Sequence, residues 1–122
     1  MKTSELTGAA LDWAVAKAER LDCYVDMRGS RNGWATFVDL GEHTHIRYTP
    51  SEHWGFGGPI IEREEIALEP MTHDEHGDGW LATRVEGPAV CMEFGPTMLI
   101  AAMRCYVAAC LGDEVDVPEE LK

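Results

Sequence analysis

A glycine-rich segment that also carries aromatic rings is the part of this chain best suited to hold a small anionic ligand. Residues 50–61 read PSEHWGFGGPII, whereas a plain linker would be polar. Backbone amides in such a loop can bind phosphate groups, and the rings of Trp54 and Tyr48 could stack on a base. We therefore predict an ordered loop in which Trp54, Tyr48, Gly57 and Gly58 contact a ligand.

A second anion site is predicted where the last apolar stretch of the chain begins. Thr97 is suited to cap a helix, and helix N-termini attract negative charge. Arg63 and Arg104 could supply countercharge, and Trp13 a further ring. Three of these residues also have a purely structural interpretation. Arg104 could form an ion pair with a core carboxylate, and Trp13 and Trp54 could pack against other elements.

Catalytic chemistry has little support in the sequence. No G-x-S-x-G segment is present, and the cysteines lie in apolar runs, which raise the pKa of a thiol. Hydrolysis by Glu62, Glu64 or Glu65 remains an alternative to simple solvation of these carboxylates. The expectation is a protein that is not an enzyme and has no catalytic residues.

The histidines do not have the spacing of a dedicated metal site. His43 and His45 form one pair, and His73 and His76 form another in an acidic turn. Neither pair lies on a long predicted helix with further ligands at a recognised spacing. We expect no bound metal and no cofactor.

Composition restricts the possible partners. The 122 residues predict a single domain spanning 1–122, and 22 acidic residues against 10 basic ones give a formal charge of −12. This charge disfavours nucleic acid as a partner. No stretch resembles a signal peptide or reaches the roughly 20 apolar residues that span a bilayer, so we expect a cytoplasmic protein that binds no membrane.

One buried helix is predicted to organise the core. Residues 98–111 read MLIAAMRCYVAACL, apolar nearly all round, with Gly112 suited to end the helix. Arg104 is the only charge in this run, so it must be paired or hydrogen-bonded.

The remaining patterns predict an α+β fold, in which an antiparallel sheet packs against two helices. Residues 3–21 have the apolar spacing of the other helix. Side chains that alternate between two faces predict six strands, and turns at 31–33 and 72–79 separate some of them. The acidic tail at 113–122 is expected to be exposed. The predicted strands are 22–28, 34–40, 43–49, one beginning near 66, 80–85 and 89–94.

Three stretches of the chain resemble the NinX-like phage proteins. They are TSELTGAALDWAVA at 3–16, PSEHW with GGPIIERE at 50–64, and GPT with LIAAMRCYVA and LGDEV at 95–115. Residues 22–43 and 72–79 are outside the resemblance. The family often has proline after the threonine, where this chain has Met98.

The resemblance implies a small accessory protein of phages or prophages, and it transfers no catalytic residues. Such proteins often counter host defence, for example by sequestering nucleotide signals. The leading hypothesis is a homo-oligomeric binder of an ADP-ribose or cyclic ADP-ribose type molecule, acting without turnover in the infected host. It requires Trp54 and Arg104 to meet at a shared cavity. The alternatives are an inhibitor of a host protein that acts through its acidic surface, and a hydrolase of the same ligand class.

Overall fold

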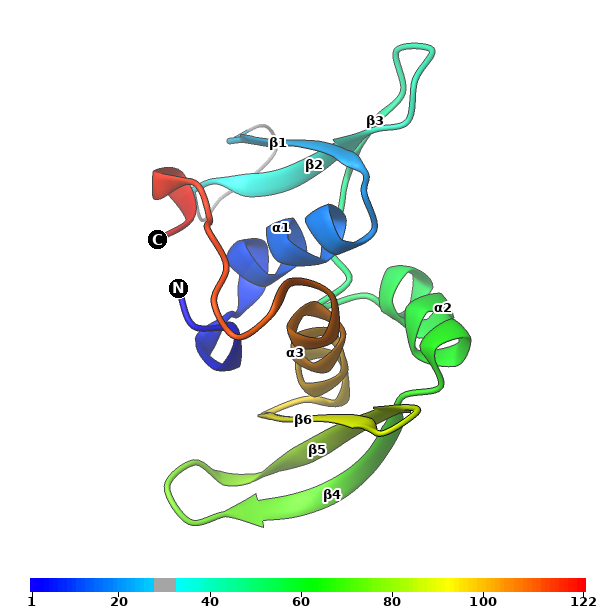
Figure 1. Ribbon diagram of the computed structural model, residues 1–122. Helices are drawn as coiled ribbons and strands as arrows, with labels where there is room; N and C mark the ends of the chain where they lie inside the picture. Colours follow the sequence, from blue (N-terminus) through cyan, green and yellow to red (C-terminus); the bar gives the residue numbers. More distant parts are fainter. Residues whose placement is uncertain (28–32) are drawn as a thin grey trace.

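The computed structural model describes residues 1–27 and 33–122 and places three helices between two sheets (Figure 1). Part of the turn predicted at 31–33 and the end of the strand predicted at 22–28 lie outside the described residues. The elements are η1 (Thr3–Glu5), α1 (Gly8–Ala18), β1 (Asp22–Asp26), β2 (Ala35–Asp39), β3 (His45–Arg47), α2 (Trp54–Glu64), β4 (Ala67–His73), β5 (Gly77–Glu86), β6 (Ala89–Gly95), α3 (Met98–Leu111) and η2 (Glu119–Leu121).

The predicted α+β class is confirmed, with the strands divided between two sheets instead of one. β1, β2 and β3 form the first sheet, and β4, β5 and β6 form the second, both antiparallel throughout. The first sheet packs on α1, and the second packs on α3 (Figure 1). The segment predicted as a turn at 72–79 is mostly strand, because β4 continues to His73 and β5 begins at Gly77.

Helix α3 is the core element that the sequence predicts, with the same bounds. It contacts α1, α2 and the second sheet, and Ala101, Ala102, Met103 and Val107 are fully buried. The Thr97 hydroxyl accepts a hydrogen bond from the Ile100 amide at 3.1 Å, which confirms the predicted cap.

Arg104 lies inside this core and is held by the backbone of two distant segments. Its Nε donates to the Leu6 carbonyl at 2.9 Å, and its Nη1 donates to the Phe94 carbonyl at 2.9 Å. No carboxylate of residues 1–27 or 33–122 forms an ion pair with it. Burial lowers the pKa of Arg104, while the nearby Glu93 and Glu5 favour its charged form.

A break in the predicted first helix makes one of these contacts possible. The helix expected at 3–21 is divided into η1 and α1, and Gly8 at the break has φ of 53°. In a continuous helix the Leu6 carbonyl would accept from the amide four residues further on. The break leaves this carbonyl free for Arg104.

The predicted glycine-rich loop is wrong, because residues 54–64 form helix α2. The helix tolerates glycines and Pro59 because it packs closely on α3. A Cβ on Gly57 would lie 2.6 Å from the Leu99 side chain and 2.8 Å from the Pro50 carbonyl oxygen. Tertiary contact therefore outweighs the poor helix propensity of this segment.

The acidic tail is only partly exposed, which corrects the expectation for 113–122. Val115 and Val117 are buried, and the Val115 amide donates to the Met1 carbonyl at 2.9 Å. Lys2 and Glu114 form an antiparallel bridge, so the two ends of the chain lie side by side. Among the described helices, none is long and apolar enough to cross a membrane.

Replacing Arg104 tests its structural role. We expect Arg104→Met to lower the free energy of unfolding by roughly 2–4 kcal/mol, because two buried carbonyls lose their donor. Urea denaturation measures this loss, and Arg20→Met, which changes an exposed arginine, is the control. Equal stability of the two variants would contradict the assignment.

Adding a methyl group to α2 tests the close packing of its glycines. Gly57→Ala should destabilise the protein by roughly 1–3 kcal/mol, because the Cβ has no space. Gly55→Ala is the matched control, since nothing lies within 4 Å of its Cβ, and it should stabilise the helix by about 0.5–1 kcal/mol. Thermal denaturation of both variants shows whether each change raises or lowers stability, and stabilisation by both would contradict the close packing at Gly57.

Candidate functional site

The turn that leads from β6 into α3 forms the wall of a hollow with two tryptophans. At Gly95 an added Cβ would lie 2.5 Å from the Ala101 amide nitrogen, so this approach requires glycine. The hollow, called here the tryptophan hollow, has a volume of about 510 Å³. It is lined by Ser51, Glu52, Trp54, Trp80, Pro96, Thr97, Met98, Leu99 and Ile100.

The tryptophan hollow combines aromatic surface with unused hydrogen-bond donors. Trp54 at the start of α2 is 51% exposed, whereas Trp80 on β5 is half-buried and packs against the core. Within the described residues, no acceptor takes the amides of Met98 and Leu99 at the start of α3. Free amides and the positive end of the helix dipole favour an anionic group there.

Ser51 contributes a buried hydroxyl to the same hollow. Its side chain is 4% exposed. Its Oγ lies close enough to the Asp12 carboxyl to lower the pKa of that group, but it makes no hydrogen bond of good geometry in the part of the chain that the structure describes. The Ser51 amide donates to Asp12 Oδ1 at 2.8 Å, which fixes this backbone against α1. A buried polar group without a well-formed hydrogen bond costs stability, but this oxygen is closed off from solvent, so a ligand in the hollow would reach it only if the Ser51 side chain turned toward the hollow.

Arg104 lies in a neighbouring hollow and does not share one with Trp54. This second hollow, called here the arginine hollow, has a volume of about 710 Å³, and Pro96 lines both. The predicted convergence of the two residues on one cavity is therefore not observed. The arginine hollow is lined by Ser4, Glu5, His73, Glu75, His76, Glu93, Phe94, Pro96 and Arg104.

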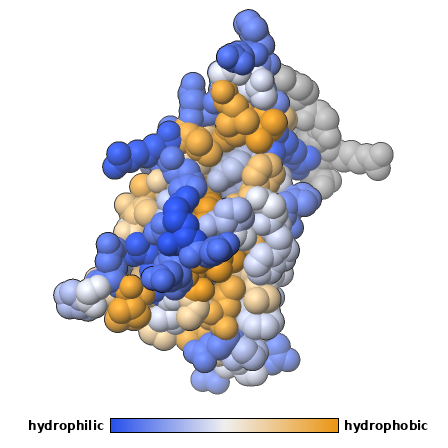
Figure 2. All heavy atoms as spheres, turned by 90° about the vertical axis from the view of Figure 1, so that its right-hand side faces the viewer, coloured by the Kyte–Doolittle hydropathy of each residue, from blue (hydrophilic) through white to orange (hydrophobic). Residues whose placement is uncertain are grey.

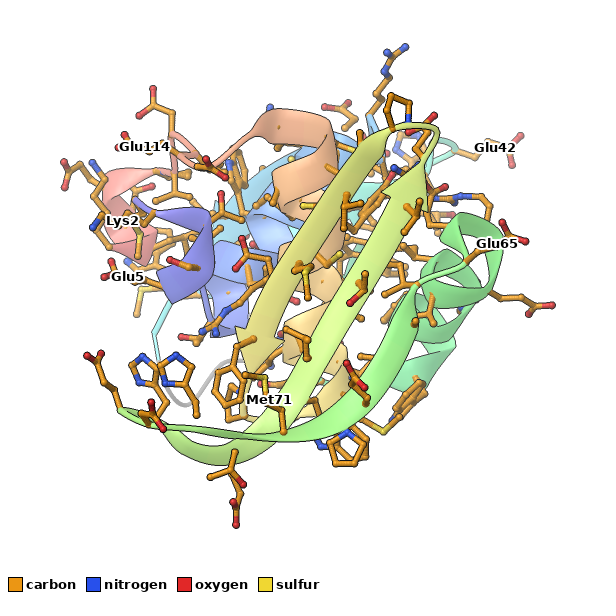
Figure 3. The ribbon with its side chains drawn as sticks, turned by 60° about the horizontal axis from the view of Figure 1, so that its bottom comes forward. Lys2, Glu5, Glu42, Glu65, Met71 and Glu114 are labelled. Carbon is orange, nitrogen blue, oxygen red and sulfur yellow. The ribbon has the colours of Figure 1, made fainter. Side chains whose placement is uncertain are left out.

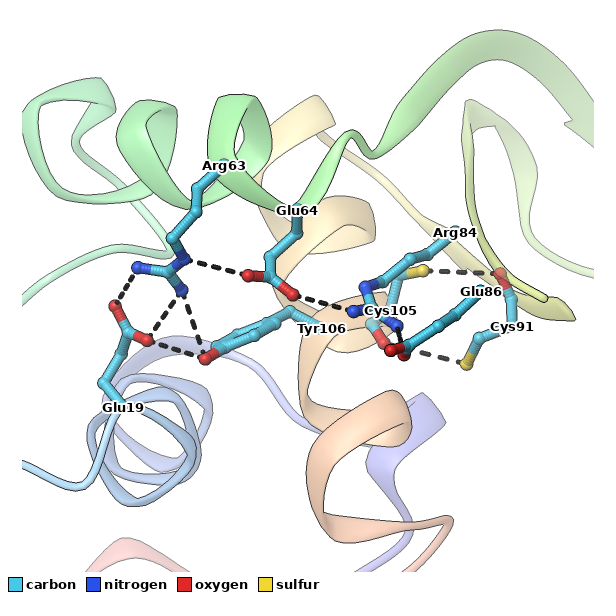
Figure 4. A network of polar contacts seen from close by, with 8 residues as sticks. All are labelled: Glu19, Arg63, Glu64, Arg84, Glu86, Cys91, Cys105 and Tyr106. Carbon is cyan, nitrogen blue, oxygen red and sulfur yellow. Dashed lines mark hydrogen bonds and ion pairs between the residues drawn. The ribbon is translucent and has the colours of Figure 1, made fainter. Parts of the chain in front are cut away.

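Arg63, another predicted ligand residue, belongs to a polar network between the helices and β5 (Figure 4). Its Nη1 and Nη2 donate to Glu19 at 3.0 and 2.8 Å, and its Nε donates to Glu64 at 2.8 Å. Tyr106 donates to Glu19 at 2.6 Å, and Arg84 donates to Glu64 at 2.9 Å. These bonds raise the pKa of Arg63 and occupy its guanidinium group.

Figure 2 shows hydrophilic side chains gathered on the α2 side of the molecule, with hydrophobic surface above and below them.

The other predicted site residues are dispersed through the fold. Tyr48 is 6% exposed and packs edge-on against Phe56, with ring centroids 5.1 Å apart. Trp13 on α1 lies under the Lys17 ammonium group, 4.9 Å from the ring centre. Gly57 and Gly58 are packed within α2 and line neither hollow. Of the predicted residues, Trp54 and Thr97 meet in the tryptophan hollow.

The thiols and histidines of the described residues offer no assembled reactive centre. Burial raises the pKa of Cys105 to about 12 and also raises those of Cys23 and Cys91. The rings of His73 and His76 lie 4.6 Å apart beside Phe94. No group of three or more potential metal ligands occurs among residues 1–27 and 33–122.

Sequence reasoning missed Ser51 and Trp80. Trp80 was recognisable as the first residue of a predicted strand, but the pairing that sets it opposite Gly95 is non-local. Nothing near Ser51 signals that its hydroxyl would be buried beside α1 and α3.

The buried Asp12 carboxyl predicts how stability depends on pH. Burial raises its pKa from 3.8 to about 7, opposed by the hydrogen bond from the Ser51 amide and the nearby Ser51 hydroxyl. The folded state therefore holds this proton more tightly than the unfolded state, and stability should fall between about pH 4 and pH 7. Asp12→Asn should remove this contribution and be more stable than the natural protein at pH 8, by roughly 2–4 kcal/mol. Urea denaturation across this range measures the difference, and equal slopes in both proteins would contradict the prediction.

Comparisons with known proteins identify a phage family. No curated protein matches the chain significantly. The family model described as "Bacteriophage P22, NinX" matches residues 2–109, which include the tryptophan hollow, helices α1 and α2, and all but the last two residues of α3. The chain therefore belongs to the NinX family of phage proteins.

Proposed function

We propose that this phage protein counters host defence by binding a nucleotide-derived signalling molecule in the tryptophan hollow. The proposed ligand is of the ADP-ribose or cyclic ADP-ribose type, and it is held in the cytoplasm of the infected host without turnover. The observation that carries the proposal is the combination of two tryptophans, two free helix amides and a buried hydroxyl without a partner.

Each group has a role that fits this class of ligand. Trp54 and Trp80 provide aromatic surface for a base, and stacking contributes about 1–3 kcal/mol per base. The amides of Met98 and Leu99 bind a phosphate oxygen. Glu52 is an acceptor for ribose hydroxyl groups, and the Ser51 hydroxyl completes the polar contacts.

Binding without turnover is preferred to hydrolysis. The arrangement described needs no nucleophile or general base to hold a ligand, and Glu64, one of the acids considered for hydrolysis, is engaged by Arg63 and Arg84. These contacts lower the pKa of Glu64, with the hydrogen bond from Arg63 as the main cause. Chromatography of ligand released by heating distinguishes the two activities, because a sequestering protein returns the molecule intact.

Calorimetry with ADP-ribose and cyclic ADP-ribose tests the proposal. Trp54→Ala should weaken binding by at least tenfold, because the exposed stacking surface is lost. Trp34→Ala is the matched control: Trp34 is 42% exposed, lies next to β2 and is absent from the tryptophan hollow, so affinity should not change. Equal loss in both variants, or no binding by the natural protein, would count against the proposal.

The Ser51 hydroxyl allows binding and folding to be separated. Ser51→Ala should reduce affinity about fivefold to tenfold, which corresponds to one hydrogen bond of about 1–1.4 kcal/mol. The same change should have little effect on thermal stability, since the hydroxyl makes no well-formed hydrogen bond in the free protein. Unaltered affinity would exclude the hydroxyl from the binding site.

A further inference from the structure

The second sheet has an outer face that no helix or strand of the described chain covers, although the His73 and His76 rings pack beside Phe94 at one end of it. Ala82 on β5 is fully buried against α3, so the alternate positions Leu81, Thr83 and Val85 point away from the helices. Strand pairing places residues of β4 and β6 beside them. The face, called here the outer apolar face, comprises Ala67, Glu69, Met71, Leu81, Thr83, Val85, Val90, Met92 and Phe94.

Large apolar side chains on the outer apolar face are open to solvent. Val85 is 64% exposed, Val90 59%, Met92 54% and Met71 38%. Val85 pairs directly with Val90, and Met92 is two residues from Val90 on the same strand face. Figure 3 shows this face of the sheet toward the viewer, with Met71 projecting from it. A contiguous exposed apolar patch of this kind marks an interaction surface.

The outer apolar face carries acidic but no basic side chains. Residues 67–95 contain one Lys or Arg, which is Arg84. Arg84 pairs with Cys91 on the inner face of the sheet, the face that packs against α3, and it donates to Glu64 and Glu86 at 2.9 and 2.8 Å. Glu69 lies on the face itself, and Glu65 precedes β4 at its edge (Figure 3). Asp74 and Glu75 lie in the turn between β4 and β5. Asp78, Glu86 and Glu93 lie on the inner face of the sheet, as Arg84 does, and are not part of the outer apolar face.

This charge pattern selects the kind of partner. Two copies of the chain joined through this face would bring acids against acids, with a charge of −12 on each copy. We propose that the outer apolar face docks a basic protein segment in which apolar side chains alternate with lysine or arginine. The apolar side chains would cover Val90 and Met92. The long basic side chains start on the opposite side of the extended segment and would reach round its edges toward Glu69 and the acids in the turn between β4 and β5. This surface is separate from the tryptophan hollow.

A synthetic peptide of alternating leucine and lysine tests the proposal. Its length of about ten residues matches that of β5, which has 10. A serine–lysine peptide of equal length and charge is the control for purely electrostatic attraction. We expect the leucine–lysine peptide to bind at least tenfold more tightly by fluorescence anisotropy, and equal affinities or no binding would overturn the proposal.

Matched variants locate the binding surface. The double variant Val90→Ser, Met92→Ser should weaken leucine–lysine binding at least tenfold, and Glu69→Gln about threefold. The control Leu40→Ser, Leu111→Ser removes two apolar side chains that are 55% and 40% exposed and lie outside this face, and it should bind normally. Equal affinity of the two double variants would overturn the assignment.

Sedimentation of the natural protein gives a second check, because a dimer abolished by Val90→Ser, Met92→Ser would assign the face to a second copy instead. Ligand binding in the tryptophan hollow should be unaffected by all these changes.

Discussion

The hydrogen bonds of one buried guanidinium group hold the central part of this fold together. Arg104 reaches from α3 to the Leu6 carbonyl, 98 positions earlier, and to the Phe94 carbonyl at the end of β6. These bonds satisfy a charge that the core could not otherwise accommodate. They also fix the chain immediately before Gly95, where β6 meets α3 too closely for any side chain. The position of the α3 N-terminus, and so of the tryptophan hollow, depends on this arrangement.

Local patterns predicted most elements of the fold but not their grouping. Helix α3 was predictable to the residue because its apolar run lies between Thr97 and Gly112. Helix α2 was not, because three glycines and Pro59 are typical of a loop. Position 57 requires glycine because the Leu99 side chain and the Pro50 carbonyl leave no space for a Cβ, and these groups approach it only in the folded chain. The division into two sheets likewise depends on packing around α3, which alternation along a strand does not encode.

Only some of the predicted ligand residues come together in the fold, and the dispersal of the others has a physical reason. Trp54 and Thr97 meet in the tryptophan hollow, whereas Arg63 is engaged by Glu19 and Glu64. An arginine in a sequence has no visible partner, so a structural ion pair and a ligand contact look the same. Nothing in the sequence pointed to Ser51, although its hydroxyl is one of two buried side-chain polar atoms without a well-formed hydrogen bond among the described residues, the other being Arg84 Nε.

In the proposed function, the tryptophan hollow beside α3 retains an anionic aromatic molecule intact. The most direct measurement is mass spectrometry of small molecules released by heat from protein purified out of infected cells with an active defence system. We expect one unhydrolysed, phosphate-bearing aromatic compound from the natural protein and none from a variant with Trp54 and Ser51 both replaced by alanine. Release of no such compound, of its hydrolysis products, or of equal amounts from both proteins would contradict it.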